Sequence, residues 1–466
     1  MKTTRRGFLG AGMTAALAAS VKPAMAAAPK GKKFFRGQFH AHTYWSDGSA
    51  FPEQAVRHYS ERGYHFLGIS DHNVYQTGRK VKKFQKKSSS QMAILEEYRK
   101  TWPRNFECKE GENGDLEVLV QPLSKMREMF EKPGEFILLD AVEATTSITY
   151  DDGVNNQVHM NYLNVPKMIE MPRKMVSEGG VARKVTVAER IRDTHKLVSD
   201  LAKEMGRDEM FILNHPVWRW YDVTPEDLIA NPEVRFFELC NGGSPYKNAK
   251  GLPSDGWATD RFWDVVNAFR ARRGEKLLYG VGTDDTHTYF NTAGSVPGIH
   301  CLAFNSWCYV RAEELTQDAL VKAMKAADFA VCEGFEPKDF SFDASTGTLS
   351  VSVDGKKNVC RTIEFIVTKK DFSEKPVKTI EVFPEDAPEK NRKICRRKIN
   401  VYDHKKIGCV AKKVSGGIGE GVSASYTMKD DDLYVRARIV SPERPAASAY
   451  QHPKVHVVWT QPYPKG

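Results

Sequence analysis

Cysteines spaced for zinc binding or thiol exchange are missing from this chain of 466 residues. No two of its eight cysteines stand in C-x-x-C spacing, which excludes zinc-knuckle and thioredoxin-like proteins. The motif G-x-S-x-G is also absent, so no serine nucleophile on a strand-to-helix elbow is predicted. The glycine-rich stretch SGGIGEG at 415–421 lies between predicted strands and lacks the helix that a phosphate-cradling loop requires, so we interpret it as an ordinary loop.

Long hydrophobic runs and a strong charge excess are missing as well. A membrane-spanning helix needs about 20 apolar residues, and because no later segment of the sequence has them, we expect no stable membrane anchor. The formal net charge is +10, of which residues 1–26 carry +4 through two lysines and two arginines without an acid. The remaining +6 is modest and dispersed, which suits a small anionic substrate and predicts no binding of nucleic acid.

The N-terminus has the pattern of an export signal. The charged stretch TRRGFL at 4–9 precedes a mild apolar run, and AMA at 24–26 has the form of a small-residue cleavage site. Paired arginines followed by Phe-Leu indicate the twin-arginine export machinery as a partner. We therefore expect residues 1–26 to be a signal peptide and the mature protein to be periplasmic or secreted.

The stretch FHAHTYWSDG at 39–48 has the composition of a metal site. It follows a predicted short strand, and residues i and i+2 of a strand point to the same side, so His40 and His42 are placed to converge on one ion. The turn at 46–48 brings the carboxylate of Asp47 back toward the strand end. The alternative is a surface turn with two incidental histidines, and the later strands favour the metal site.

Further His, Asp and Glu residues stand near the ends of predicted buried strands, where packing does not need them. They are Asp71 and His72 at the end of strand 64–73, Glu143 in 136–145, His159 in 155–165, His215 in 210–216, Glu238 in 236–242, and Asp285 and His287 in 277–287. Helices are predicted over 51–62, 186–204, 257–273 and 316–327, with another from 224. This alternation predicts an α/β fold, a distorted seven-stranded TIM-like barrel with its active site at the C-terminal ends of the strands.

Residues 76–135 interrupt the alternation, and we interpret them as an insertion over the mouth of the site. Its lysine-rich run at 79–87 is either a solvated loop or an electropositive rim that draws anions inward. The barrel domain, including this insertion, is expected to span 34–335.

From residue 338 to 466 the sequence predicts a small all-β, sandwich-like domain. Alternating or short apolar segments stand at 348–353, 362–367, 378–382, 433–440 and 455–460. Because an exported chain meets an oxidising compartment, we expect one disulfide among Cys360, Cys395 and Cys409, with the pairing left open. The histidines of this region, His404, His452 and His456, are expected to take no part in catalysis.

The side chains at the strand ends form a predicted metal-ligand set. Its members are His40, His42, Asp47, His72, Glu143, His159, His215, Asp285 and His287. Histidine with carboxylate suits zinc, manganese or iron(II). Nine ligands exceed the needs of one ion and fit about three ions at about four ligands each, some of them shared.

Together these pieces resemble the PHP (polymerase and histidinol phosphatase) family. The motifs HAHTYWSDG, SDHN, VHMN, NHP and DDTH and the strand-end Glu143 carry the resemblance over about residues 35–335. It implies a PHP-type barrel with a trinuclear site. His40, His42, Glu143 and Asp285 would hold the first ion; Glu143, His159 and His215 the second; and Asp47, His72 and His287 the third. The family's final motif is usually Asp-x-His, which favours Asp285, with Asp284 as the alternative.

We accordingly expect a metal-dependent phosphoesterase for a small phosphomonoester or diester, in which a hydroxide that bridges the ions attacks phosphorus. Asp71 and Asp285 are the predicted catalytic carboxylates. Asp71, Asn73 and Asn214 flank ligands and are placed to orient them, and Glu238 is either such a partner or a buried structural acid. Arg219 is either a phosphate contact or a surface arginine, and Trp218 either borders the leaving group or packs in the core.

Two other functions stay open at this point. The same site could hydrolyse a carboxylic ester, amide or carbamate, because amidohydrolases also begin with His-x-His on the first strand. The chain could instead be a non-enzymatic protein that binds a polymer through its β-region. The intact ligand set favours an enzyme, and the Ser-Asp-His and Asp-x-His strand endings favour a PHP protein.

Overall fold

The computed structural model describes residues 31–111, 113–170, 185–242, 258–289, 303–383, 389, 393, 396–443 and 455–465, without the side chains of 219 and 220. The predicted signal peptide, Cys395 and His452 therefore lie outside the described residues. Within the described ranges no helix is both long and apolar enough to cross a membrane. Cys360 and Cys409 are free thiols, so the expected disulfide does not form between those two.

The structure is a mixed α/β fold, as predicted. Its described helices are α1 (Pro52–Ser60), α2 (Ser89–Thr101), α3 (Leu123–Phe130), α4 (Val187–Glu204), α5 (Trp218–Tyr221), α6 (Pro225–Ile229), α7 (Ala258–Arg272) and α8 (Gln317–Lys325). Helix α4 begins with a capping box. The Thr186 hydroxyl accepts a hydrogen bond from the Glu189 amide at 3.2 Å, and the Glu189 carboxylate accepts one from the Thr186 amide at 2.9 Å.

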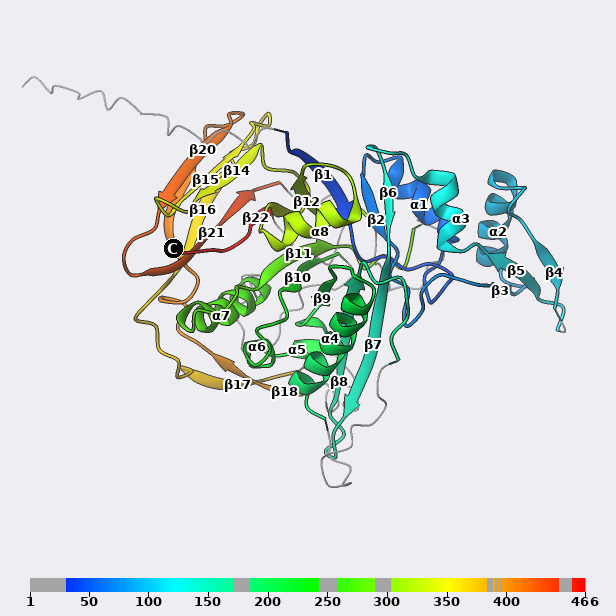
Figure 1. Cartoon of the computed structure of the whole chain (residues 1–466), viewed down its shortest axis with the longest axis horizontal. Coiled ribbons are helices and arrows are strands. Elements are labelled where there is room, and N and C mark those ends of the chain that lie inside the picture. The colour runs from blue at the N-terminus through cyan, green and yellow to red at the C-terminus, as the bar shows by residue number, and fades with distance from the viewer. Residues whose placement is uncertain are drawn as a thin grey trace, which may run out of the picture.

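A five-stranded sheet lies behind α4 and α7 (Figure 1). Its order is β11 (Tyr279–Thr283), β10 (Phe236–Asn241), β9 (Met210–Leu213), β8 (Asn155–Leu163) and β7 (Ala141–Thr149). β9, β10 and β11 are parallel, whereas β8 runs antiparallel to both of its neighbours. The reason is local: β7 and β8 are joined by a short turn at 150–154, which leaves no room for a crossover helix.

A second sheet has ten strands and includes both ends of the described chain. Its path is β19 (Cys409–Ser415), β16 (Thr362–Lys369), β21 (Asp432–Ser441), β22 (His456–Thr460), β13 (Phe329–Cys332), β12 (Trp307–Ala312), β1 (Lys33–Gln38), β2 (Phe66–Gly68) and β6 (Ile137–Leu139), with β23 (Tyr463–Pro464) beside β21. β1, β2 and β6 are parallel. The chain passes from β6 into β7 of the other sheet through Asp140.

The two sheets do not form one closed barrel in the described part of the chain. Only isolated bridges link them, between Ala41 and Thr286 and between His72 and Glu143. The predicted closed seven-stranded barrel is therefore not confirmed. Both bridges involve or adjoin predicted metal ligands, so the strand ends that carry these ligands do meet.

The C-terminal region is joined to the rest of the protein through the ten-stranded sheet, because β22 pairs with β13 (Ala330 with Thr460 and Cys332 with Val458). A small sheet of β14 (Asp339–Asp343), β15 (Thr348–Val353) and β20 (Val422–Thr427) packs against β16 and β21. A separate two-stranded sheet consists of β17 (Lys378–Val382) and β18 (Arg397–Val401). The expected self-contained sandwich is not confirmed, since one of its two layers continues into β13, β12 and β1.

The insertion forms a small subdomain with its own sheet and hydrophobic cluster. β3 (Lys80–Phe84), β5 (Leu116–Val120) and β4 (Cys108–Glu110) make a three-stranded sheet that shares a hydrophobic cluster with α2. Tyr44 and Trp45, from the loop at 39–48, belong to the same cluster, and the Trp45 indole donates a hydrogen bond to the Gln121 carbonyl at 2.8 Å. The insertion therefore packs directly against the loop that carries the first predicted ligands.

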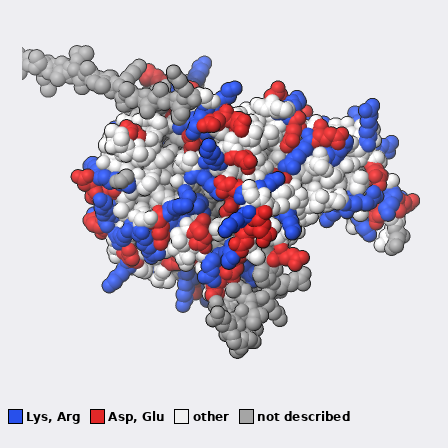
Figure 2. Space-filling view, in the orientation of Figure 1, with Lys and Arg blue, Asp and Glu red and all other residues white. Residues whose placement is uncertain are grey.

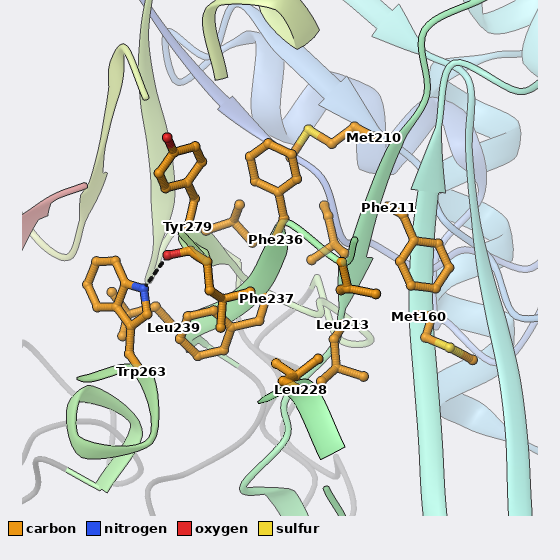
Figure 3. Close-up of a cluster of buried hydrophobic side chains, with 14 of the residues drawn as sticks. Met160, Met210, Phe211, Leu213, Leu228, Phe236, Phe237, Leu239, Trp263 and Tyr279 are labelled. Carbon is orange, nitrogen blue, oxygen red and sulfur yellow. Dashed lines mark hydrogen bonds between the residues drawn. The ribbon is translucent and has the colours of Figure 1, made fainter. Parts of the chain in front are cut away.

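The main core lies between the five-stranded sheet and the helices that cover it (Figure 3). Phe237 and Leu239 of β10 and Leu213 of β9 are almost fully buried there. The Trp263 indole of α7 donates a hydrogen bond to the Leu278 carbonyl at 2.7 Å, which satisfies its only donor inside the core. On the face of the molecule shown in Figure 2, cationic and anionic side chains are interspersed, in keeping with the modest net charge.

Candidate metal centre

His40 and His42 follow directly after β1 and converge as their i, i+2 spacing predicts. Backbone hydrogen bonds hold this segment beside the end of β11, from the His42 amide to the Thr286 carbonyl at 2.9 Å and from the Asp285 amide to the His40 carbonyl at 3.0 Å. Both imidazoles are fully buried, and their Nε2 atoms lie 3.0 Å apart. Two ring nitrogens this close to each other indicate that both histidines are placed to bind the same ion.

Two carboxylates complete the first group of donor atoms. Glu143 Oε2 lies 3.3 Å from His40 Nε2 and 3.4 Å from His42 Nε2. Asp285 Oδ1 lies 3.2 Å and 3.1 Å from the same two nitrogens. Bonds of about 2.0–2.2 Å from zinc to nitrogen or oxygen would separate tetrahedral ligand atoms by about 3.3–3.6 Å. The first group therefore has close to the spacing of ligands around one small ion.

A second group lies on the other side of the Glu143 carboxylate. His159 Nδ1 is 3.1 Å and His215 Nε2 is 3.8 Å from Glu143 Oε1. Asp285 Oδ2 lies 3.9 Å from His215 Nε2, so both Glu143 and Asp285 face two groups of donors. His215 and Asp285 also have positive φ angles of 24° and 52°. Residues other than glycine rarely adopt this backbone conformation, and such strain is concentrated at functional sites.

The third group lies at the outer side of the centre. Asp47 Oδ1 is 3.3 Å from His287 Nε2, 3.6 Å from His72 Nε2 and 3.8 Å from His42 Nδ1. The Asp47 side chain is 59% exposed, whereas that of Glu143 is fully buried. His72 is also 2.7 Å from Glu143 Oε2 through its Nδ1 atom. The structure thus brings all nine predicted ligands together around Glu143.

The donor set fits divalent cations. Glu143 Oε2 and both ring nitrogens of His159 are buried and make no hydrogen bond within the described structure. Unsatisfied buried polar atoms are costly, and here they are the types of atom that coordinate zinc, manganese or iron. Three overlapping groups satisfy the distance requirement for a cation, namely His42, Asp47, His72 and His287; His40, His42 and Glu143; and His72, Glu143 and His159.

The electrostatics of the centre favour ionised carboxylates. Burial raises the pKa of Glu143, but His40 and His72 outweigh it and hold that pKa well below its usual range. The pKa of Asp285 is likewise well below its usual range, because His40 and His42 outweigh the effect of burial. Burial lowers the pKa of His42 to about 4. The same carboxylates raise the pKa of His40, His72 and His215, so these imidazoles hold protons that a bound cation would displace.

Several side chains that are not themselves predicted ligands form hydrogen bonds to the ligand residues. Glu238 Oε1 lies 2.6 Å from His40 Nδ1, and Glu238 Oε2 accepts a hydrogen bond from the His215 amide at 2.8 Å. Of the two interpretations of Glu238, the structure thus supports a hydrogen-bonded partner of a ligand. Asn214 donates a hydrogen bond to Glu143 Oε1 at 2.9 Å, as its position beside His215 suggested.

Sequence reasoning missed other supporting residues. They are Thr145, whose hydroxyl is 2.6 Å from His72 Nδ1; Asn161, which donates to the Phe39 carbonyl; and Asn241 and Thr283, which donate to Glu238. Asn161 stands two residues after His159 on the same strand, and this spacing was an available signal. Thr145 and Thr283 are ordinary strand residues, and nothing in their local sequence distinguishes them.

Asp71 and Asp284 are engaged with protein groups and not with the ligand atoms. Asp71 accepts hydrogen bonds from the Thr43 amide and hydroxyl and from the Ser46 hydroxyl, all at 2.6–2.7 Å. It therefore positions the loop at 39–48. Asp284 accepts three backbone hydrogen bonds from residues 304–306 and one from Tyr59, while burial raises its pKa to about 6. Asp285, and not Asp284, faces the histidines.

The short helix α5 contributes Trp218 to the border of the centre. Its ring centroid lies 5.0 Å from that of His215 and 5.6 Å from that of His159. The side chain of Arg219 is outside the described structure, so its predicted phosphate contact stays a prediction. Asn73 donates to the Thr145 carbonyl at 3.2 Å and accepts from the Thr145 amide at 2.9 Å, which fastens the segment after β2 to β7.

Comparison with known proteins gives likenesses of structure alone. No family model matches the sequence, and no curated protein matches it either. Similar solved structures include a two-domain protein from Bacteroides vulgatus that contains a predicted PHP-like metal-dependent phosphoesterase, with 12% identity, a TM-score of 0.35 and coverage of 93% of this chain and 95% of that one.

Two further solved structures are similar over a smaller part of this chain. An amidohydrolase from Chromobacterium violaceum has 13% identity and a TM-score of 0.26, over 54% of this chain and 87% of that one. A proposed metal-dependent phosphoesterase from Bifidobacterium adolescentis has 13% identity and a TM-score of 0.25, over 56% and 91%.

Proposed function

We propose that this protein is a metal-dependent hydrolase that cleaves a small phosphomonoester or diester. The observation that carries the proposal is a cluster of six histidines with the carboxylates of Asp47, Glu143 and Asp285, which has donor atoms near ligand spacing and buried atoms left unsatisfied. A structural role does not explain this set, because buried polar groups in a protein core are normally paired with one another.

The chain's own residues would hold three ions in the arrangement that the PHP resemblance implies. His40, His42, Glu143 and Asp285 form the first group, Glu143, His159 and His215 the second, and Asp47, His72 and His287 the third. Bound divalent ions supply Lewis-acid polarisation of a substrate oxygen and lower the pKa of water to near neutrality.

Residues behind the ligands fix the donors before substrate arrives. Glu238 favours a proton on His40 Nδ1, so that Nε2 faces the other ligand atoms with its lone pair free. Asn214 orients one oxygen of Glu143 and leaves the other oxygen pointing at the first and third groups. This preorganisation means that little rearrangement is needed during the reaction.

A small phosphoester suits the chemistry of the surroundings. Among the described residues of the centre, no serine or cysteine is placed as a nucleophile against a histidine base. The Ser46 hydroxyl donates a hydrogen bond to Asp71, and its oxygen lies 3.4 Å from His42 Nδ1, a nitrogen that faces Asp47. Trp218 provides an apolar border where an organic leaving group would pack. Hydrolysis of a carboxylic ester, amide or carbamate at the same centre is the alternative.

We also propose export through the twin-arginine machinery. The support is the pattern of residues 1–26, which combines paired arginines, a short apolar run and a small-residue cleavage site. Replacing Arg5 and Arg6 together by lysine should retain the unprocessed protein in the cytoplasm, whereas the unchanged protein should be recovered in the periplasm or medium. Equal export of both proteins would contradict this assignment.

The function is tested by phosphate release from phosphomonoesters and diesters, using the purified mature protein loaded with zinc, manganese or iron(II). We expect release that chelation abolishes and that Asp285→Ala lowers at least a hundredfold. His58→Ala is the matched control, because His58 is on α1 and outside the three ligand groups. Absence of release from a protein shown to contain metal, together with turnover of esters, amides or carbamates, would establish the alternative.

A further inference from the structure

The lysine-rich strand β3 has two sides with different surroundings. Successive residues of a strand point to opposite sides, so Lys80, Lys82 and Phe84 share one side, while Lys83 is on the other. Phe84 is buried, and its ring lies 5.3 Å from that of Tyr44 and 5.6 Å from that of Phe51. The side that carries Lys80 and Lys82 therefore faces the loop that provides His42 and Asp47.

Three other basic residues of the run at 79–87 are paired with neighbouring carboxylates. Lys83 Nζ lies 3.5 Å from a carboxylate oxygen of Glu117. Arg79 lies 2.7 Å from Glu107, and Lys86 is paired with Glu110. In contrast, neither Lys80 nor Lys82 has a carboxylate within 4.0 Å among the residues that the structure describes. Of the three lysines of β3, the two without a described carboxylate partner thus lie on the side toward the metal centre.

Lys82 extends along the loop of the metal centre. Its Nζ atom lies 5.0 Å from the centroid of the Tyr44 ring, and the side chain is partly buried. Burial and the charge of Lys80 lower the pKa of Lys82, while the carboxylate of Asp47 opposes this change. Tyr44 stands two residues after His42 and three before Asp47, so the contact with its ring places the ammonium group beside the loop that carries both predicted ligands.

This arrangement does not stabilise the folded chain by itself. Two like charges on one side of a strand repel each other, and partial burial of an unpaired ammonium group costs free energy. The aromatic contact with Tyr44 offsets part of that cost. A negatively charged ligand at the outer side of the metal centre would remove both penalties.

We propose that Lys82, assisted by Lys80, forms an anion-binding face that holds the phosphoryl group of the substrate at the outer side of the metal centre. This inference rests on the proposed phosphoesterase function and narrows its substrate class. A phosphomonoester carries up to two negative charges and a diester carries one, so two added cations favour the monoester. Lys82 is thereby a substrate-binding residue that the insertion adds to the metal centre.

The test is calorimetric binding of inorganic phosphate to the metal-loaded mature protein. We expect Lys82→Gln to raise the Kd for phosphate about tenfold or more, which is the usual effect of losing a hydrogen bond to a charged group. Lys80→Gln should have a smaller effect, and Lys82→Arg should retain binding. Lys83→Gln is the matched control, since it removes the same charge from the opposite side of the same strand and should leave the Kd unchanged.

Turnover provides a second measurement. In Lys82→Gln the value of kcat/KM should fall more for p-nitrophenyl phosphate than for bis(p-nitrophenyl) phosphate, chiefly through KM. A wild-type protein that binds phosphate in a Lys82-dependent way but hydrolyses neither ester would overturn the proposed function and leave the anion-binding face standing.

Three results would overturn the anion-binding face itself. The first is a wild-type protein, with its metals in place, that binds no phosphate. The second is an equal Kd in Lys82→Gln and Lys83→Gln. The third is a loss of bound metal in Lys82→Gln but not in Lys83→Gln, because the lysine would then act through Asp47 and not on the substrate.

Discussion

Oε1 of Glu238 lies 2.6 Å from Nδ1 of His40, and this contact turns the opposite ring nitrogen toward the other ligand atoms. Both side chains are fully buried. His40 holds the pKa of Glu238 below its usual range although burial raises it. The carboxylate of Glu238 therefore supports the first group of ligands without belonging to it.

Glu238→Gln should weaken metal binding because it removes the negative charge that fixes the His40 tautomer. Loss of such a partner typically lowers metal affinity by about 10- to 100-fold. The measurement is competition for zinc with a chromophoric chelator. Glu53→Gln is a control, since Glu53 is a buried carboxylate that accepts hydrogen bonds from Tyr98 and Asn105, away from the centre. Equal affinities in both variants would contradict the role given to Glu238.

Asp47→Asn should remove one bound ion and leave two. Asp47 is the only one of the nine ligands whose side chain is mostly exposed, while the first and second groups are buried. We expect the same ion to be the first that a limiting amount of chelator removes from the wild-type protein. Elemental analysis of the metal-to-protein ratio checks both statements, and simultaneous loss of all ions would show that the third group is not separate.

Glu333 should make the stability of the protein depend on pH. Its carboxylate is fully buried just after β13, neither oxygen makes a hydrogen bond to the residues that the structure describes, and burial raises its pKa from 4.5 to about 8. Between these two values the native state binds more protons than the unfolded chain. The free energy of unfolding should therefore fall as the pH rises from about 5 to about 8, and level off above that.

Glu333→Gln should remove this contribution, so that the variant gains stability relative to wild type at pH 8.5 and little at pH 5. Urea denaturation at the two pH values, at constant metal concentration, measures the difference. A variant that is less stable than wild type at pH 8.5 would mean that the ionised carboxylate has a favourable partner.

The convergence of the nine proposed ligands could be predicted from sequence because each stands at or just past a buried strand where packing needs no charge. His40 and His42 converge through strand alternation alone, and Asp285 is selected over Asp284 by the Asp-x-His spacing. Helix α4 could also be predicted, since Thr186 and Glu189 form a capping box that depends only on local sequence.

Features that depend on tertiary pairing could not be predicted. The antiparallel direction of β8 is a different case, because the turn at 150–154 contains Asp152-Gly153, a local hairpin signal that sequence reasoning missed. The pairing of β22 with β13 joins residues far apart in the chain, so the sheet continues where the sequence suggests a separate sandwich. The contact between Lys82 and Tyr44 likewise depends on how the insertion packs.

The most direct test of the central claim is the metal content of Glu143→Gln, measured by elemental analysis beside wild type and the His58→Ala control. Glu143 is the residue on which the donor groups converge, with one oxygen facing His40, His42 and His72 and the other facing His159 and His215. We predict about three ions per chain in wild type and His58→Ala, and at most one in Glu143→Gln. A wild-type protein that binds no more than one ion, or a Glu143→Gln protein that retains the full number, would contradict a multinuclear centre organised on this carboxylate.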